Sequence, residues 1–184
     1  FCAASILTNT ATAWVNQITA GRTVTLGVTS IQGGEAPNVI PDTADILGSL
    51  RFFNDEEGEK AVRIFKNVAE HTAAMNNCQV QFDDRFCVLC APVINDEYYS
   101  NLISAALPEV LLENVTVSSC EPWYASESFS CYRRICPSVL AHLGINNPSY
   151  GSGAAHHNGF FDVDEGVLST GVIATLKFVA MLQK

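Results

Sequence analysis

Basic residues are scarce in this chain of 184 residues. Ten lysines and arginines stand against 19 aspartates and glutamates, which gives a formal net charge of −9 at pH 7. An acidic surface repels phosphate backbones and anionic membrane surfaces. We therefore expect no nucleic-acid partner and no membrane partner.

Long apolar runs are also absent, since no stretch reaches the roughly 18 consecutive apolar residues of a membrane-spanning helix. Hydrophobic residues still make up 48% of the chain, so a packed core is expected in one medium-sized domain or two small ones. There is no initiator Met, and "FCAASILTNTATAWVNQITA" lacks a basic flank. We interpret this opening as a helix truncated at its start, not as a signal peptide.

The seven cysteines lack the even number and regular spacing of a disulfide framework. We therefore expect free thiols in a reducing compartment and a cytoplasmic location. Only Cys87 and Cys90 form a C-x-x-C pair. Without a second pair or a nearby histidine, they are interpreted as buried strand cysteines, with a zinc half-site in a small binding domain as the alternative.

The sequence also lacks several catalytic signatures. There is no G-x-S-x-G, no H-E-x-x-H, no P-loop and no dinucleotide fingerprint. The usual evidence for several enzyme classes is therefore missing.

What the chain does contain begins with a small α+β layer. Helical spacing of apolar residues and a cap at Asn54 or Asp55 predict two helices, and alternation of β-branched residues predicts three strands. The helices are expected over 3–18 and 54–77, and the strands over 23–34, 42–53 and 78–86.

After this layer the pattern changes to strands alternating with helices, which is typical of part of an α/β sheet. Strands are expected over 87–93, 113–119 and 138–145, and helices over 95–111, 125–135 and 164–182. We place the domain boundary so that residues 1–85 form one domain and 86–184 another.

Two adjacent histidines, His156 and His157, follow the glycine-rich stretch "GSGAA" on a loop after a predicted strand. Adjacent histidines cannot easily bind one ion together, so at most one of them is a metal ligand. The alternative is a pair of solvent-facing or locally hydrogen-bonded loop histidines. The acids that follow, Asp162, Asp164 and Glu165, are interpreted as charges at a helix start.

The stretch "GGEAPNVIPD" places Asn38 between Pro37 and Pro41, which stiffen the backbone and present the amide in a fixed direction. Arg51 ends the following strand, where its guanidinium could face a carboxylate. The alternative for both residues is a purely structural role in a turn and at a strand end.

Three segments together resemble one family. These are "VTLGVTSIQGGEAPNVIPDTADILGSLRFF", "SESFSCYRRICPSVLAHLGI" and "HHNGFFDVDEGVL". They resemble, in the same order, the lid, the S-E-D-F-x-x-Y segment and the C-terminal L-H-N-P-x-F-x-x-D-E-x-x-L segment of the amidohydrolase and carboxypeptidase family of dimetal metallopeptidases. That family includes hippurate hydrolase, aminoacylase, auxin-conjugate hydrolases and succinyl-diaminopimelate desuccinylases. Ser128 stands where Asp is usual, and Gly159 replaces the usual Pro.

The resemblance implies an amidohydrolase that cleaves an N-acyl amino acid or a related small amide with two divalent ions, most simply zinc or manganese. An ungapped register of the last segment places His157 on the metal-binding histidine and His156 on the preceding apolar position. Asn38 and Arg51 match the substrate-orienting residues of the lid. The lid dimerises in this family, which implies a homodimer.

The family's GHD-x-H-like motif, its paired glutamates and the lid's histidine motif are not in this chain. No catalytic residue is therefore assigned here, and one histidine cannot hold two metals. We expect the chain to be the C-terminal piece of a longer enzyme and to be inactive alone. The alternative is a non-catalytic dimerisation or scaffold protein derived from the family.

The fold implied by this resemblance has two parts. Residues 1–85 would form most of an α+β lid, a ferredoxin-like α/β sandwich of the dimerisation type without its N-terminal portion. Residues 86–184 would form the C-terminal part of an α/β metallopeptidase catalytic domain.

Overall fold

The structure, a computed structural model of the chain, describes residues 1–18, 24–83, 91–112 and 114–183. The chain divides into two compact units. The first comprises Phe1–Val93 with Trp123–Cys131, and the second comprises Ile94–Pro122 with Tyr132–Lys184. The expected domain boundary between residues 85 and 86 and the Cys87–Cys90 pair lie outside the described residues. The strand predicted over 87–93 lies partly outside them, and its described residues 91–93 form no strand.

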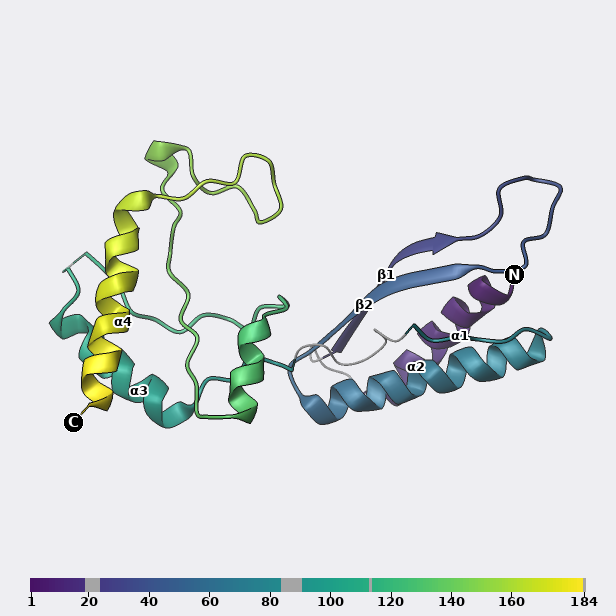
Figure 1. Cartoon of the computed structure of the whole chain (residues 1–184), viewed down its shortest axis with the longest axis horizontal. Coiled ribbons are helices and arrows are strands. Elements are labelled where there is room, and N and C mark those ends of the chain that lie inside the picture. The colour runs from purple at the N-terminus through teal and green to yellow at the C-terminus, as the bar shows by residue number, and fades with distance from the viewer. Residues whose placement is uncertain (19–23, 84–90, 113, 184) are drawn as a thin grey trace. The chain divides into compact units, whose positions relative to one another are not determined.

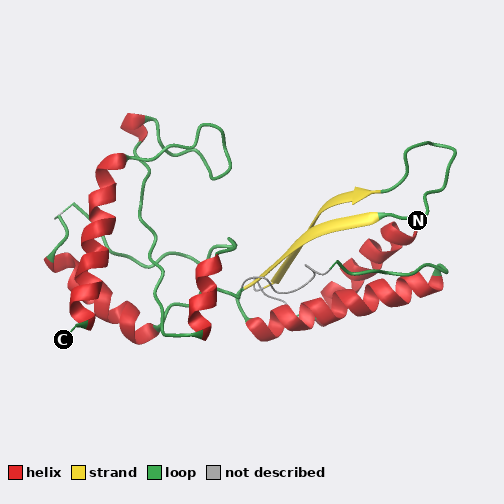
Figure 2. Ribbon diagram, viewed as in Figure 1, coloured by secondary structure: helices red, strands yellow, loops and turns green. Residues whose placement is uncertain are grey.

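The first unit is a hairpin covered on one face by two helices, as Figures 1 and 2 show. The elements follow the chain as α1 (Cys2–Gln17), β1 (Val24–Gln32), β2 (Asp45–Phe52) and α2 (Asp55–Met75). The strands pair antiparallel from Val24↔Phe52 to Gln32↔Asp45, with a register shift between Val28 and Ser30. Both predicted helices and the first two predicted strands are confirmed.

Alternation along the strands explains why the helices cover only one face. Val24 is buried beneath the helices, whereas its neighbour Thr25 and the residue opposite Thr25, Arg51, are exposed. Small residues let the two helices approach closely, and a hydrogen bond from the Asn9 amide to the Thr72 hydroxyl (3.0 Å) joins them. The buried apolar core of this unit includes Ile6, Val24, Ala61, Ile64, Ala69 and Ala73.

Helix α2 starts where the sequence predicts. The Asn54 side chain accepts a hydrogen bond from the Glu57 amide (3.1 Å), and three acids occupy the first turn. A side-chain cap satisfies an amide that the helix itself cannot pair, and the acids complement the positive end of the helix dipole. Local chemistry alone therefore accounts for this helix end.

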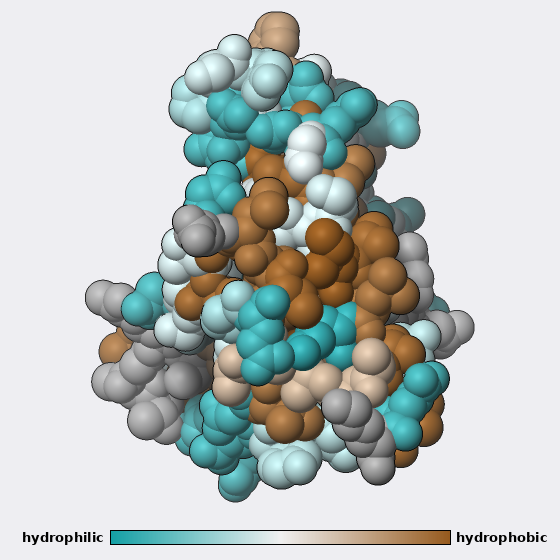
Figure 3. All heavy atoms as spheres, turned by 90° about the vertical axis from the view of Figure 1, so that its left-hand side faces the viewer, coloured by the Kyte–Doolittle hydropathy of each residue, from teal (hydrophilic) through white to brown (hydrophobic). Residues whose placement is uncertain are grey.

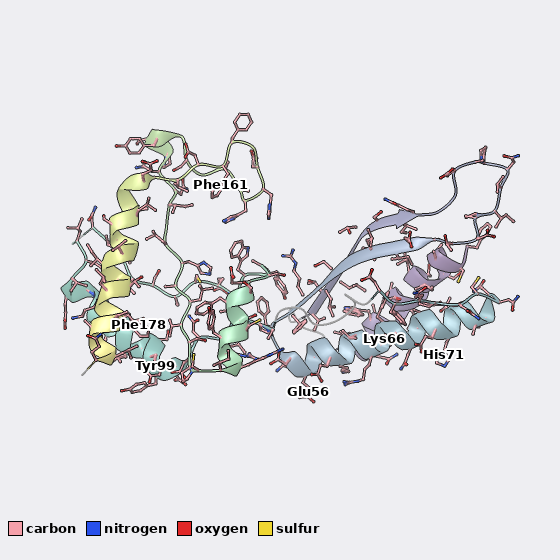
Figure 4. The ribbon with its side chains drawn as sticks, in the orientation of Figure 1. Glu56, Lys66, His71, Tyr99, Phe161 and Phe178 are labelled. Carbon is pink, nitrogen blue, oxygen red and sulfur yellow. The ribbon has the colours of Figure 1, made fainter. Side chains whose placement is uncertain are left out.

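The predicted strand at 78–86 is wrong over its described part. Residues 78–83 form no strand, and the described sheet holds β1 and β2. The Lys66 ammonium of α2 instead lies 5.3 Å from the centre of the Phe82 ring, a cation–π contact. Alternating residues supply a strand pattern, but a strand also needs a neighbouring backbone to pair with. Figure 4 shows Lys66 on α2.

The second unit is built on helices α3 (Glu97–Ala106) and α4 (Leu168–Leu182), with short 3₁₀ turns. Asp96 caps α3 by accepting from the Tyr99 amide (3.0 Å). The Tyr99 and Phe178 rings meet edge to face with their centres 6.3 Å apart, so α3 packs on α4 (Figure 4). The helices predicted over 95–111 and 164–182 are confirmed. The helix predicted over 125–135 is the 3₁₀ helix Ser128–Arg134.

The strands predicted at 113–119 and 138–145 are wrong over the described residues, which form no strand there. The second segment still finds polar partners. The Asn95 side chain accepts from the Leu140 amide (2.8 Å) and donates to the Leu140 carbonyl (2.9 Å), and the Asp96 amide donates to the Ser138 carbonyl (2.9 Å). A side chain thus replaces the neighbouring strand that the pattern requires.

Helix α4 is apolar and largely uncovered. Residues Glu165–Leu182 have the length and mean hydropathy of a membrane-crossing helix, and none of that segment is buried. A helix that is apolar over most of its surface belongs in a protein core or in a membrane, and length and composition alone do not separate the two. Figure 3 shows apolar side chains gathered on the side that carries α3 and α4.

The expected fold is therefore confirmed in coarse form. Two helices on an antiparallel hairpin fit an α+β lid, whereas the complete ferredoxin-like sandwich and the α/β sheet remain predictions.

Candidate functional site

The loop that carries the two histidines is fastened at its base by Ser152, whose side chain is buried. The Ser152 hydroxyl accepts from the Asn147 amide (2.5 Å) and lies 3.1 Å from the carbonyls of Ile145 and Asn147. The flanking glycines have positive φ, 76° at Gly151 and 127° at Gly153. The "GSG" stretch therefore turns the chain at a conformation that residues with a Cβ rarely adopt.

Asp164 closes the other end of this loop. Its carboxylate accepts from the Asn147 amide group (2.6 Å) and from the Gly166 backbone (2.9 Å), and its own amide donates to the Ile145 carbonyl (3.1 Å). Asp164 is thus the N-cap of the 3₁₀ turn Glu165–Val167. This confirms the interpretation of Asp164 as a helix-start charge.

His157 lies at the corner of a tight turn. The Asn158 amide donates to the Ala155 carbonyl (3.2 Å), which makes His157 the third residue of that turn, and its φ is 63°. Glycine and asparagine are the residues that usually occupy such a left-handed position. Its side chain is exposed. Unusual backbone conformations of this kind recur at functional sites.

His156 has a different environment. Its ring lies 5.2 Å from the Phe161 ring, centre to centre, with the planes tilted by 32°. Phe161 is labelled in Figure 4. Both histidines are exposed, and His156 in addition packs on an aromatic ring of the same loop.

The described residues do not complete a metal centre. No group of three or more His, Cys, Asp or Glu side chains in the described part of the chain is arranged to hold an ion. A zinc site requires three or four protein ligands, and a two-metal site requires more. His157 can therefore supply at most one ligand to a centre completed by other residues.

Arg51 lies at the end of β2, opposite Thr25. Its guanidinium donates to the backbone carbonyl of Tyr124, within the same unit. The Tyr124 ring packs on the neighbouring Phe53 ring with their centres 4.4 Å apart. The segment around Tyr124 is therefore held against the end of the strand that carries Arg51.

Tyr124 is a residue that sequence reasoning did not single out. It lies 73 positions from Arg51, and its contact with Arg51 uses a backbone carbonyl, which every residue has. The one available signal was an aromatic pair, Trp123 and Tyr124, just before the "SESFS" segment. In that segment, Glu127 accepts from the Phe129 amide (3.1 Å), as a helix-start charge does.

Asn38 lies at the far end of the hairpin from Arg51. Pro37 and Asn38 occupy the centre of a turn closed by the Val39 amide and the Ala36 carbonyl (3.3 Å), and the loop is exposed. The loop that carries Asn38 ends where β2 begins, at Asp45. Asp45 and Arg51 are six residues apart along the strand, which corresponds to about 20 Å. One chain therefore does not bring Asn38 and Arg51 together.

Comparison with known families gives a match for the first unit. Residues 7–76 match the peptidase dimerisation domain. That range contains α1, the hairpin and α2.

Curated relatives match a longer part of the chain. The IAA-amino acid hydrolase ILR1-like 4 of Arabidopsis thaliana is 28% identical over 147 residues, which cover 78% of this chain and 33% of the relative. Thermostable carboxypeptidase 2 of Saccharolobus solfataricus is 28% identical over 153 residues, 81% of this chain and 37% of the relative. The N-acetylcysteine deacetylase of Bacillus subtilis is 28% identical over 144 residues, which cover 78% of this chain and 35% of the relative. The chain thus spans about a third of the length of these relatives.

One solved structure has the same fold. The YXEP protein of Bacillus subtilis, described as a dinuclear metal-binding peptidase of the M20 family, superposes with a TM-score of 0.71 at 21% identity. The match covers 96% of this chain and 45% of that one. The resemblance to the amidohydrolase and carboxypeptidase family is therefore confirmed.

Proposed function

We propose that the whole protein is a metal-dependent amidohydrolase. Residues 7–76 of the chain match the peptidase dimerisation domain. The substrate would be an N-acyl amino acid or a related small amide. The observation that carries this proposal is the dimerisation domain followed by a continued match to hydrolases of such compounds. In this proposal, residues 1–85 are the lid and 86–184 belong to the catalytic domain.

Arg51 would bind the carboxylate of the substrate. Its guanidinium is exposed, carries five N–H donors, and is oriented by the Tyr124 carbonyl through one of its terminal nitrogens. A planar guanidinium matches a carboxylate with two parallel hydrogen bonds. Arg51 would therefore select substrates that end in a free acid.

Asn38 would hold the amide or its developing oxyanion. About 20 Å of strand β2 separates Arg51 from the loop that carries Asn38. The two residues of one chain therefore cannot contact the same small substrate. A homodimer resolves this, since Asn38 of one subunit can enter the site that contains Arg51 of the other. The dimerisation domain supports that assembly.

His157 would contribute one imidazole ligand to a divalent ion, zinc or manganese, in a centre that holds two ions in the complete enzyme. The described residues do not fit such a centre by themselves. We assign no catalytic residue within this chain, and we expect the chain alone to be inactive.

A cytoplasmic location is proposed from the odd, irregularly spaced cysteines, which favour a reducing compartment. The apolar helix α4 is proposed to pack within protein, because it already contacts its neighbour α3 through Phe178.

The alternative is a non-catalytic dimerisation or scaffold protein of the same ancestry. The observation behind it is the match of residues 7–76 to the peptidase dimerisation domain, which such a scaffold would retain. The two proposals differ in the metal content that they predict for the full native protein, since only the enzyme binds metal stoichiometrically.

The test is metal analysis and hydrolysis of N-acyl amino acids by the full native protein and two matched variants. We expect His157→Ala to lose metal and to lower kcat/KM at least 100-fold, because a metal ligand is removed. His156→Ala should keep its metal and most of its activity, because that ring packs on Phe161. Full metal content in both variants would overturn the assignment of His157 as a metal ligand. A native protein that binds no metal would favour the scaffold proposal.

A further inference from the structure

Helices α1 and α2 of the first unit run antiparallel, and their hydrogen bond fixes the register. Asn9 of α1 contacts Thr72 of α2 at 3.0 Å. Cys2 precedes Asn9 by seven residues, and Cys78 follows Thr72 by six. At 1.5 Å per helical residue, both cysteines are displaced by about 10 Å in the same direction from that contact.

The end of α2 turns Cys78 back toward the helix. Asn77 adopts a left-handed conformation with φ of 53°, and the Cys78 amide donates to the Ala73 carbonyl (2.9 Å). This hydrogen-bond pattern is typical of a helix C-terminus. Cys78 is thereby held beside the helix end, with its thiol donating to the Asn76 carbonyl (3.4 Å).

Both thiols therefore lie at the same end of the helix pair. Burial raises the pKa of the Cys2 thiol above its ordinary value, and the nearby Cys78 thiol raises it further. Cys2 is half-buried, whereas Cys78 is exposed to solvent and its reagents. The exposed Cys78 is therefore the thiol that meets a reagent first, and the raised pKa of Cys2 assigns it the later, resolving step.

We propose that Cys2 and Cys78 are a redox modification site that closes to an intramolecular disulfide. The oxidant is a small-molecule disulfide such as oxidised glutathione. The Cys78 thiolate attacks one glutathione sulfur and expels the other glutathione as a thiolate. The Cys2 thiolate then displaces the second glutathione. Two protein thiols are oxidised, one glutathione disulfide is reduced to two glutathiones, and the two protons go to solvent or to the released thiolates.

The consequence of closure is mechanical. A Cys2–Cys78 bond links the first turn of α1 to the end of α2, and it encloses the hairpin and both helices in one covalent loop. Cross-links across long loops restrict the unfolded chain most strongly. Oxidation therefore stabilises the unit that matches the dimerisation domain.

The test exposes the full chain to a glutathione redox series and maps its cysteines by mass spectrometry. We expect a linked peptide pair carrying Cys2 and Cys78, reversible with dithiothreitol, and a melting temperature roughly 10 °C above that of the reduced chain. Cys78→Ser should abolish both effects. Cys120→Ser, at an exposed cysteine of the second unit, should leave both unchanged.

Three results would overturn the proposal. They are glutathione adducts on Cys78 without linkage to Cys2, a disulfide between two chains, and an equal rise in melting temperature for Cys78→Ser. The readouts are thiol linkage and melting. Their outcome is therefore independent of whether the protein hydrolyses amides.

Discussion

At the scale of residues, the histidine loop combines predictable chemistry with unpredictable geometry. The resemblance distinguishes His157 from His156, and the structure gives the two side chains different surroundings. The left-handed backbone of His157 could not be read from the sequence, because residues 155–158 contain no glycine, the usual signal for such a position. The cap at Asp164 could be predicted, because it depends on neighbours in the sequence.

Gly153 gives a test of the loop base. Its φ is 127°, and a Cβ there would lie 2.6 Å from the Asn146 side-chain oxygen. We expect Gly153→Ala to lower the free energy of unfolding by about 1–3 kcal/mol through strain and contact. Urea denaturation measures this. Gly159→Ala is the matched control, since a Cβ at Gly159 meets nothing within 4 Å. Equal stability of the two variants would contradict the role given to Gly153.

At the scale of elements, prediction succeeds where an element is locally determined. Helix α2 carries its own cap, first-turn acids and apolar stripe, so its ends follow from the sequence. The segment 138–145 has a strand-like composition, but pairing depends on a neighbour far along the chain. There the Asn95 side chain takes that place. Strand formation is therefore the part of the fold that sequence patterns determined least.

The contact between Tyr124 and the end of β2 also depends on distant residues. Its ring packs on Phe53, and its buried hydroxyl has no hydrogen-bond partner among the described residues. We expect Tyr124→Ala to lower the free energy of unfolding by about 1–2 kcal/mol, because the ring contact is lost. Tyr124→Phe should be neutral or stabilising by up to about 1 kcal/mol, since it removes an unpaired buried hydroxyl. Thermal melts of both variants measure this, and a Tyr124→Phe as unstable as Tyr124→Ala would contradict it.

At the scale of the whole molecule, the proposed site needs two subunits. Arg51 and Asn38 lie at opposite ends of one hairpin. If each site takes Arg51 from one subunit and Asn38 from the other, two different inactive variants can complement each other. If both residues act within one chain, they cannot.

We therefore predict complementation between Asn38→Ala and Arg51→Ala in the full native protein. Each variant alone should lose most activity. The two variants are unfolded together in equal amounts and refolded, so that half of the dimers contain one subunit of each variant. Each mixed dimer regains one of its two sites. About a quarter of the native activity should return. Activity of the mixture equal to the mean of the two separate variants would contradict the shared site.

Helix α4 has a consequence for the chain inside a cell. Leu168, Val172, Leu176 and Val179 recur at helical spacing and are 46–63% exposed. Molecular chaperones and quality-control proteases recognise apolar stripes of this kind, because a finished protein covers them. Whatever covers α4 therefore also governs the lifetime of the polypeptide, and the abundance of this chain would report whether that cover is in place.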